Sequence, residues 1–228
     1  MTDDDLTALP GFVPPPIASE LEAELGKLAP VATRRPMRQL ALLVAGSLIY
    51  GAALLAVLTV RRDAGELPTA WLVGGGLAWL VGFIVPSYLA LVPAPGSMLA
   101  RQRYASIAAI TVAIAFVLMG MMIHPDGPSS TQYGAARFLH GHWCLELGLA
   151  TALVPVLLGA LFLRGALPVG SRWVAAALGA GGGSLGGLVL HFHCRITDPL
   201  HTGVIHAGVV TVAALLAAAL VPRATDVR

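Results

Sequence analysis

The sequence predicts an all-α, polytopic integral membrane protein with about six transmembrane helices and a short amphipathic helix near its N-terminus. Of its 228 residues, 57% are hydrophobic and only 11% are charged, and the mean hydropathy is +0.79. Soluble domains are typically about 45–50% apolar and about 25% charged. The apolar residues also gather in separate stretches of about 20 residues, the length that a helix needs to cross a bilayer. We therefore predict a cytoplasmic tail over 1–38, a membrane domain over 39–222 and a C-terminal tail over 223–228.

The tail contains IASELEAELGKLAP, which predicts a helix over about 19–29. Ser19 and Glu22 are spaced as a capping box, and Pro30 ends the helix. Three leucines at positions i, i+4 and i+7 form one apolar face: Leu21, Leu25 and Leu28. A helix of this length is marginal in water, so the apolar face needs a surface. A hydrophobic groove on a partner protein suits this acidic helix better than anionic lipid does, and a spacer that packs on the protein's own inner loops is the alternative.

The predicted membrane helices are the six apolar stretches at 39–60, 70–92, 104–123, 143–163, 173–191 and 202–221. The fifth is the weakest by length, and it is rich in glycine. Gly179, Gly183 and Gly187 are four residues apart and share a face of this helix. Small residues at that spacing let membrane helices approach closely, so we expect another helix to pack there.

Lysine and arginine set the predicted orientation, because they favour the cytoplasmic side of short loops. Ten lie on the side of the two termini: Lys27, Arg34, Arg35, Arg38, Arg101, Arg103, Arg164, Arg172, Arg223 and Arg228. Four lie on the other side: Arg61, Arg62, Arg137 and Arg195. Both termini are therefore predicted to be cytoplasmic, although the first external loop, RRDAGELPT, runs against the trend.

Histidine and cysteine gather on the predicted external side. All seven histidines and both cysteines fall at or near it: His124, His140, His142, His191, His193, His201, His206, Cys144 and Cys194. Imidazole and thiolate are ligands for zinc and copper. The candidate residues for sensing, for metal binding or for a disulfide are Cys144, Cys194, His140, His142, His193, Asp198, His201 and His206.

Three interpretations of this external group stay open. One is a metal or redox sensing site, with zinc or copper as the ion. Another is a structural disulfide between Cys144 and Cys194, with histidines that only form hydrogen bonds near the lipid headgroups. The third is haem ligation or a proton relay.

Two functional classes are disfavoured. The net charge of +2 is too small to indicate direct nucleic-acid binding. The sequence contains no HExxH or P-loop pattern and no paired intramembrane carboxylates, so we do not expect an enzyme.

Three segments together resemble a known family: ELEAELGKLAPVATRRPMR at 20–38, WCLELGLATALVPVLL at 143–158 and HCRITDPLHTGVIHAG at 193–208. They are similar to the NrsF-type membrane anti-sigma factors, including the CarR-like ones. The features shared are a leucine helix followed by Pro-Val and a basic stretch, a Trp-Cys opening of the fourth span, and a Cys, Asp-Pro, His and His-Ala-Gly pattern.

The resemblance implies a multi-pass protein of the bacterial inner membrane. Such a protein holds an extracytoplasmic-function sigma factor through its tail and releases it on an external signal. The residues implied to bind the partner are Leu21, Glu22, Leu25, Leu28, Pro30 and Val31. Cys144 and Cys194 match the family's external cysteines, which are linked to sensing. The alternative function is a periplasm-facing metal-binding or haem-binding membrane protein.

Overall fold

The computed structural model describes residues 34–92, 98–123, 125, 141–164 and 172–225. The chain divides into two compact units, Met1–Arg34 and Arg35–Arg228. The predicted tail helix over 19–29 lies outside the described residues, together with every residue expected to bind the partner. All the helices that the structure describes belong to the second unit.

Six described helices are long and apolar enough to cross a membrane. They are α3 (Pro36–Leu58), α4 (Thr69–Leu91), α5 (Met98–Met122), α7 (His142–Leu163), α8 (Arg172–His193) and α9 (Ala207–Thr225), which continues the π-helical turn η2 (His201–His206). No strand occurs among the residues that the structure describes. The all-α, six-span prediction is confirmed. The helix ends lie a few residues from the predicted ones on either side, because an apolar run does not mark the terminal turns of a helix.

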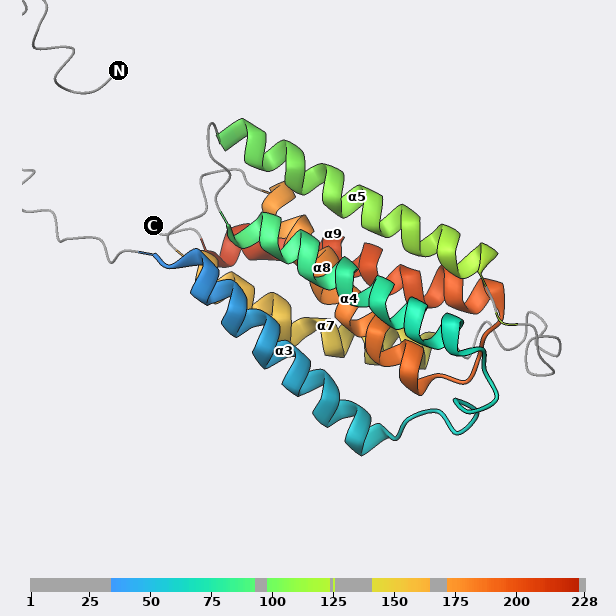
Figure 1. The fold of residues 1–228 in the computed structure, drawn as a ribbon. Helices are drawn as coiled ribbons and strands as arrows, with labels where there is room; N and C mark the ends of the chain where they lie inside the picture. Colours follow the sequence, from blue (N-terminus) through green and yellow to red (C-terminus); the bar gives the residue numbers. More distant parts are fainter. Residues whose placement is uncertain (1–33, 93–97, 124, 126–140, 165–171, 226–228) are drawn as a thin grey trace, which may run out of the picture. The chain divides into compact units, whose positions relative to one another are not determined.

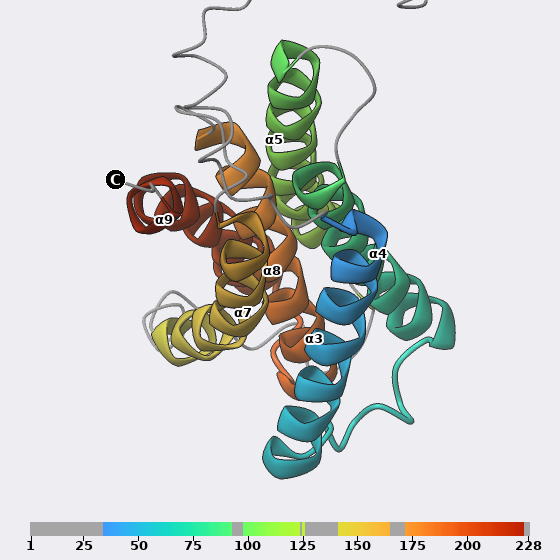
Figure 2. The same cartoon turned by 90° about the vertical axis from the view of Figure 1, so that its left-hand side faces the viewer.

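Helix α8, the weakest prediction, lies at the centre of the bundle (Figures 1 and 2). In its most apolar window 89% of the residues are buried inside the protein, against 22–39% for the other five spans. It packs on α3, α4, α5, α7 and α9. The other spans face outward with large apolar side chains, as lipid contact requires. Because protein rather than lipid surrounds α8, it needs little apolar side-chain volume, which explains its weak sequence pattern.

The glycines of α8 let its neighbours approach closely. A Cβ at Gly183 would lie 2.6 Å from Val210 Cα of α9, and one at Gly182 would lie 2.9 Å from Ala152 O of α7. A Cβ at Gly181 would lie 3.0 Å from Phe83 O of α4. The predicted close packing is confirmed at Gly179 and Gly183, which both meet α9, whereas Gly187 meets Trp79 of α4. Close packing therefore extends to three sides of the helix. Backbone meets backbone on these sides, so α8 cannot move without moving its neighbours.

The two ends of the bundle differ in chemistry. At one end lie residues 59–68, 141–144 and 191–206, which we call the histidine end. At the opposite end an apolar cluster joins the start of α8 to the start of α3 and to the ends of α4 and α7. Its members include Leu40, Leu43, Leu91, Leu163, Val174 and Leu178. The membrane side on which each end lies stays a prediction.

Candidate metal centre

Four side chains from three elements meet at the histidine end. Cys144 lies in the first turn of α7, and Cys194 directly follows α8. The backbone N–H of Cys194 donates to Leu190 O at 2.7 Å, which continues the helical hydrogen bonding and fixes the position of Cys194. His201 and His206 are the first and last residues of η2.

The π-helical turn brings His201 and His206 together. In an α-helix each residue turns by about 100°, so residues five apart point about 140° away from each other. A π-helix pairs residues i and i+5, as the Ala207 N–H does here with Thr202 O. Residues five apart therefore lie almost one turn apart, on nearly the same side. The two imidazole centroids are 4.9 Å apart, with an edge-to-face angle of 73°.

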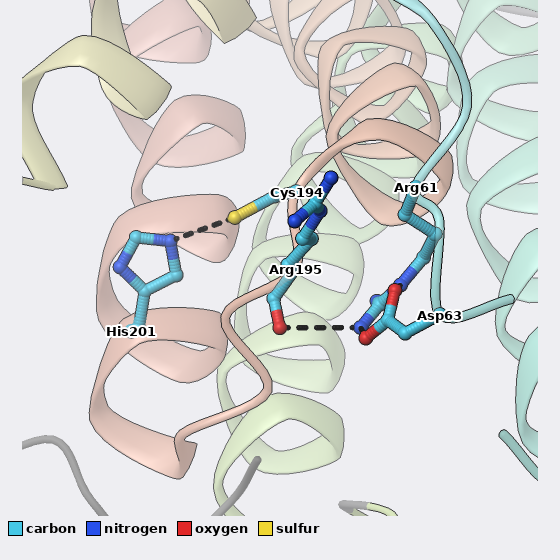
Figure 3. Close-up of polar contacts among 5 residues, drawn as sticks. All are labelled: Arg61, Asp63, Cys194, Arg195 and His201. Atoms are coloured by element: carbon cyan, nitrogen blue, oxygen red, sulfur yellow. Dashed lines mark hydrogen bonds and ion pairs between the residues drawn. The ribbon is translucent and has the colours of Figure 1, made fainter. Parts of the chain in front are cut away.

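The donor atoms are spaced as ligands around one ion. The sulfurs of Cys144 and Cys194 are 3.8 Å apart. Cys194 Sγ is 3.4 Å from His201 Nε2 (Figure 3). One donor atom from each of the four residues, including His206, lies within 4.8 Å of the others. Zinc bonds of about 2.3 Å to sulfur and about 2.0–2.1 Å to nitrogen give tetrahedral edges of about 3.8 Å and about 3.6 Å. A disulfide bond would need about 2.05 Å.

Burial makes these donors costly to leave unused. His201 is 3% exposed, His206 is 4% exposed and Cys194 is 7% exposed. His206 Nε2 is buried with no hydrogen-bond partner among the described residues, and so is His201 Nδ1, the ring nitrogen of His201 that does not face Cys194. A buried polar group without a partner costs about 1–3 kcal/mol. Two thiols and two imidazoles form a set that suits Zn²⁺ or Cu⁺, and the residues present therefore fit the predicted metal.

The other predicted site residues have different surroundings. Asp198 caps the last span, since its Oδ1 accepts the backbone N–H of Leu200 at 3.0 Å and of His201 at 3.2 Å. His193 Nδ1 lies 2.9 Å from Thr59 O, where it joins α8 to the first loop. The His142 ring lies against the Trp143 ring, with centroids 5.2 Å apart and the two planes tilted by 38°. His140 lies outside the described residues.

Arg61 was not predicted as a site residue, yet it fastens the first loop to the end of α8 (Figure 3). It is 4% exposed and pairs with Asp63 through both guanidinium Nε and Nη2, each at 2.8 Å. Its Nη2 also donates to Arg195 O at 3.2 Å, and its backbone N–H donates to Phe192 O at 2.8 Å. The signal in the sequence was the charge of this loop, which opposes the general trend. A buried arginine has a structural task that overrides the charge preference of loops.

We expect Asp63→Asn to loosen this loop. The hydrogen bond from Arg61 holds the pKa of Asp63 below its usual value, so the pair stabilises the loop at neutral pH and loses that effect as pH falls through the lowered pKa. Loss of the charge should speed hydrogen exchange of a peptide covering residues 59–66 about tenfold, or roughly 1.4 kcal/mol. Glu66→Gln makes the same chemical change at an exposed position of the same loop and should have no effect. Equal exchange in both variants would contradict the fastening role of Arg61.

Comparison with protein families gives one match across almost the whole chain. The family described as negative regulator of sigma F (NrsF) matches residues 26–225. No curated protein and no solved structure matches the chain. The matched region includes the four clustered donors and all six spans.

Proposed function

Because the chain belongs to the NrsF family of negative regulators of sigma F, we propose that it is an anti-sigma factor of the bacterial inner membrane. In this proposal the cytoplasmic N-terminal tail holds an extracytoplasmic-function sigma factor. An external signal received at the histidine end changes the membrane domain and frees the sigma factor. Membership of this family supports a regulatory function rather than an enzymatic one. The proposal that the protein senses a signal rests on the buried group of Cys144, Cys194, His201 and His206.

The input is a metal ion held by two thiolates and two imidazoles. The four donors come from α7, the end of α8 and η2, so an ion bound among them would draw three elements toward one point. A signal shifts a conformational equilibrium only by its differential affinity for the two states. Metal binding satisfies this condition if the elements sit closer together in one state than in the other. Oxidation of the two thiols to a disulfide would act on two of the same elements.

Helix α8 provides a path between the ends of the bundle. Cys194 directly follows it at the histidine end, and at the other end Val174 and Leu178 belong to the cluster that also contains Leu40 and Leu43 of α3. Helix α3 follows the tail in the sequence. Close backbone contacts along α8 favour a rigid-body shift over local deformation. Such a shift would reach the start of α3 and change how the tail presents its leucines.

An affinity purification from native cells tests the proposal. We expect a sigma factor to co-purify with the wild-type protein tagged at its C-terminus, and not with Leu21→Asp/Leu25→Asp. Two aspartates on the apolar face would abolish docking into a hydrophobic groove. The matched control is Ala23→Asp/Gly26→Asp, which adds the same charges on the opposite face of the predicted helix, since each residue turns by about 100°. Mass spectrometry identifies the captured proteins.

Two outcomes would contradict the anti-sigma proposal. One is that no sigma factor is captured with the wild-type protein. The other is that both double variants capture it equally well. With either result, a metal-binding membrane protein becomes the better interpretation, because the geometry of the donor cluster does not depend on a sigma factor.

A further inference from the structure

A groove of about 460 Å³ lies on the outer surface of the bundle, between α5, α8 and α9. Half of its lining residues are alanines, namely Ala109, Ala113, Ala176, Ala214 and Ala218. Ala109 and Ala176 are buried, whereas Ile110, Trp173 and Leu215 are exposed. The small side chains therefore form the floor of the groove and the larger ones form its rim, which opens toward lipid.

The shape and chemistry of the groove fit an alkyl chain. On α9 its lining extends from Thr211 to Ala218, which is about 10 Å at the helical rise of 1.5 Å per residue. Apart from Thr211 and Arg172, every lining residue is apolar. No water is present in the hydrocarbon region to fill a groove that opens between two spans. The chain of a lipid is therefore the occupant that the surroundings supply.

Arg172 places a positive charge at one end of this groove. It is the first residue of α8, where the apolar span begins, and its side chain is exposed. None of the hydrogen bonds and ion pairs among the described residues involves its guanidinium group. The next residue, Trp173, is an aromatic side chain of the kind that gathers at the level of lipid headgroups. Arg172 is therefore free to bind a headgroup.

The charge around Arg172 favours an anionic headgroup. Ala105 of α5 and Val174 of α8 belong to one apolar cluster, so Arg103 and Arg172, each two residues earlier, lie at the same end of the bundle. Arg103 is exposed and precedes Ile110 of the groove by seven residues, which places both on one face of α5. The acidic residues that the structure describes lie at the histidine end or within one turn of it: Asp63, Glu66, Glu146 and Asp198.

We propose that this groove binds one chain of an anionic phospholipid and that Arg172 binds its phosphate. Basic residues between membrane helices hold anionic headgroups in this way. A second groove of about 210 Å³, between α7 and α9, has no charged residue in its lining and should not select a headgroup. The binding is independent of the anti-sigma proposal. Only an influence of this lipid on signalling, through the start of α8, would rest on the proposed function.

Native mass spectrometry of the full-length protein in detergent tests the headgroup. With equal amounts of phosphatidylglycerol and phosphatidylcholine that carry the same chains, we expect one bound lipid, the phosphatidylglycerol. Arg172→Gln should lower its affinity about fivefold, or roughly 1 kcal/mol, the effect of one basic residue at the membrane surface. Arg164→Gln removes the same charge at the end of α7, outside the groove, and should leave the preference unchanged. Equal affinity in both variants would overturn the proposal.

Two alanine variants test the groove itself. Ala218 lines the proposed site, and Ala160 lines only the groove between α7 and α9. Both alanines are partly buried, so the two substitutions by leucine are matched. Ala218→Leu should fill the groove and remove the bound phosphatidylglycerol, and Ala160→Leu should retain it. Retention of the lipid by both variants would place it elsewhere on the protein and overturn the assignment.

Glycerol phosphate tests the need for the chain. It carries the phosphate of the lipid but no acyl chain, so a large excess should leave the phosphatidylglycerol bound. Full displacement would show that Arg172 binds soluble phosphates without help from the groove, and it would overturn the assignment of a lipid. No sigma factor is present in these assays, so failure here and failure of the anti-sigma proposal are separate results.

Discussion

Replacing Gly183 by alanine is expected to destabilise the membrane domain by about 1–3 kcal/mol, the usual cost of overpacking. The added Cβ would lie 2.6 Å from Val210 Cα and 2.9 Å from Val209 O. Both atoms belong to the backbone of α9, so no side-chain rotation relieves the contact. Helices α8 and α9 would have to separate along their whole interface. Thermal unfolding in detergent should show a midpoint several degrees lower.

Gly208→Ala is the control for this experiment. Gly208 lies in α9, and a Cβ there meets nothing within 4 Å. Alanine is favoured over glycine in a helix by about 0.5–1 kcal/mol, so this variant should be unchanged or slightly more stable. If both variants unfold at the same temperature, the backbones of α8 and α9 do not meet as closely as the structure shows.

Removal of one donor from the cluster should weaken metal binding about 100-fold. Structural zinc sites with four ligands bind with about 10–16 kcal/mol, or about 3 kcal/mol for each ligand. We expect the reduced wild-type protein to bind one Co²⁺, which substitutes for Zn²⁺, with thiolate charge-transfer and tetrahedral ligand-field bands in its absorption spectrum. Cys194→Ser and His206→Ala should each raise the dissociation constant for Co²⁺ about 100-fold. Protons compete for the same donors, so affinity should fall as pH is lowered.

His193→Ala is the matched control, since His193 bonds to the backbone of Thr59 and lies outside the cluster. Its affinity for Co²⁺ should equal that of the wild-type protein. If the reduced wild-type protein gives no cobalt spectrum, the metal proposal fails and thiol oxidation remains as the input. If the His193 variant loses as much affinity as the His206 variant, the assignment of the four donors is wrong.

The spans and the location of the candidate site could be predicted from the sequence, because both follow from local patterns. Runs of apolar residues define the helices, and the grouping of histidines and cysteines between particular spans fixes the end of the bundle where they lie. The central position of α8 could not be predicted in the same way. From the sequence, its low apolarity predicts only a weak membrane span. The packing shows that neighbouring helices fill the space beside its glycines, so that large apolar side chains are not needed there.

The membership of the cluster also required the structure. His201 and His206 would point apart in an α-helix, and it is the π-helical turn that places both beside Cys194. Asp198 has the same apparent ligand character in the sequence, but its carboxylate accepts backbone N–H groups at the start of the last span. The buried role of Arg61 depends on carbonyls more than 100 residues away in the sequence, which no local pattern reveals.

The sparse side chains of α8 also bear on how the protein is made. A segment rich in glycine gains little from entering lipid alone, because membrane insertion rewards large apolar residues such as leucine and isoleucine. By the time α8 leaves the ribosome, the four preceding spans have already been synthesised. These spans provide helix surfaces on which a glycine-rich helix can pack closely, and lipid provides none. We therefore expect α8 to enter the membrane by packing on the spans that were translated before it. Helix α9, translated last, then completes the packing around α8.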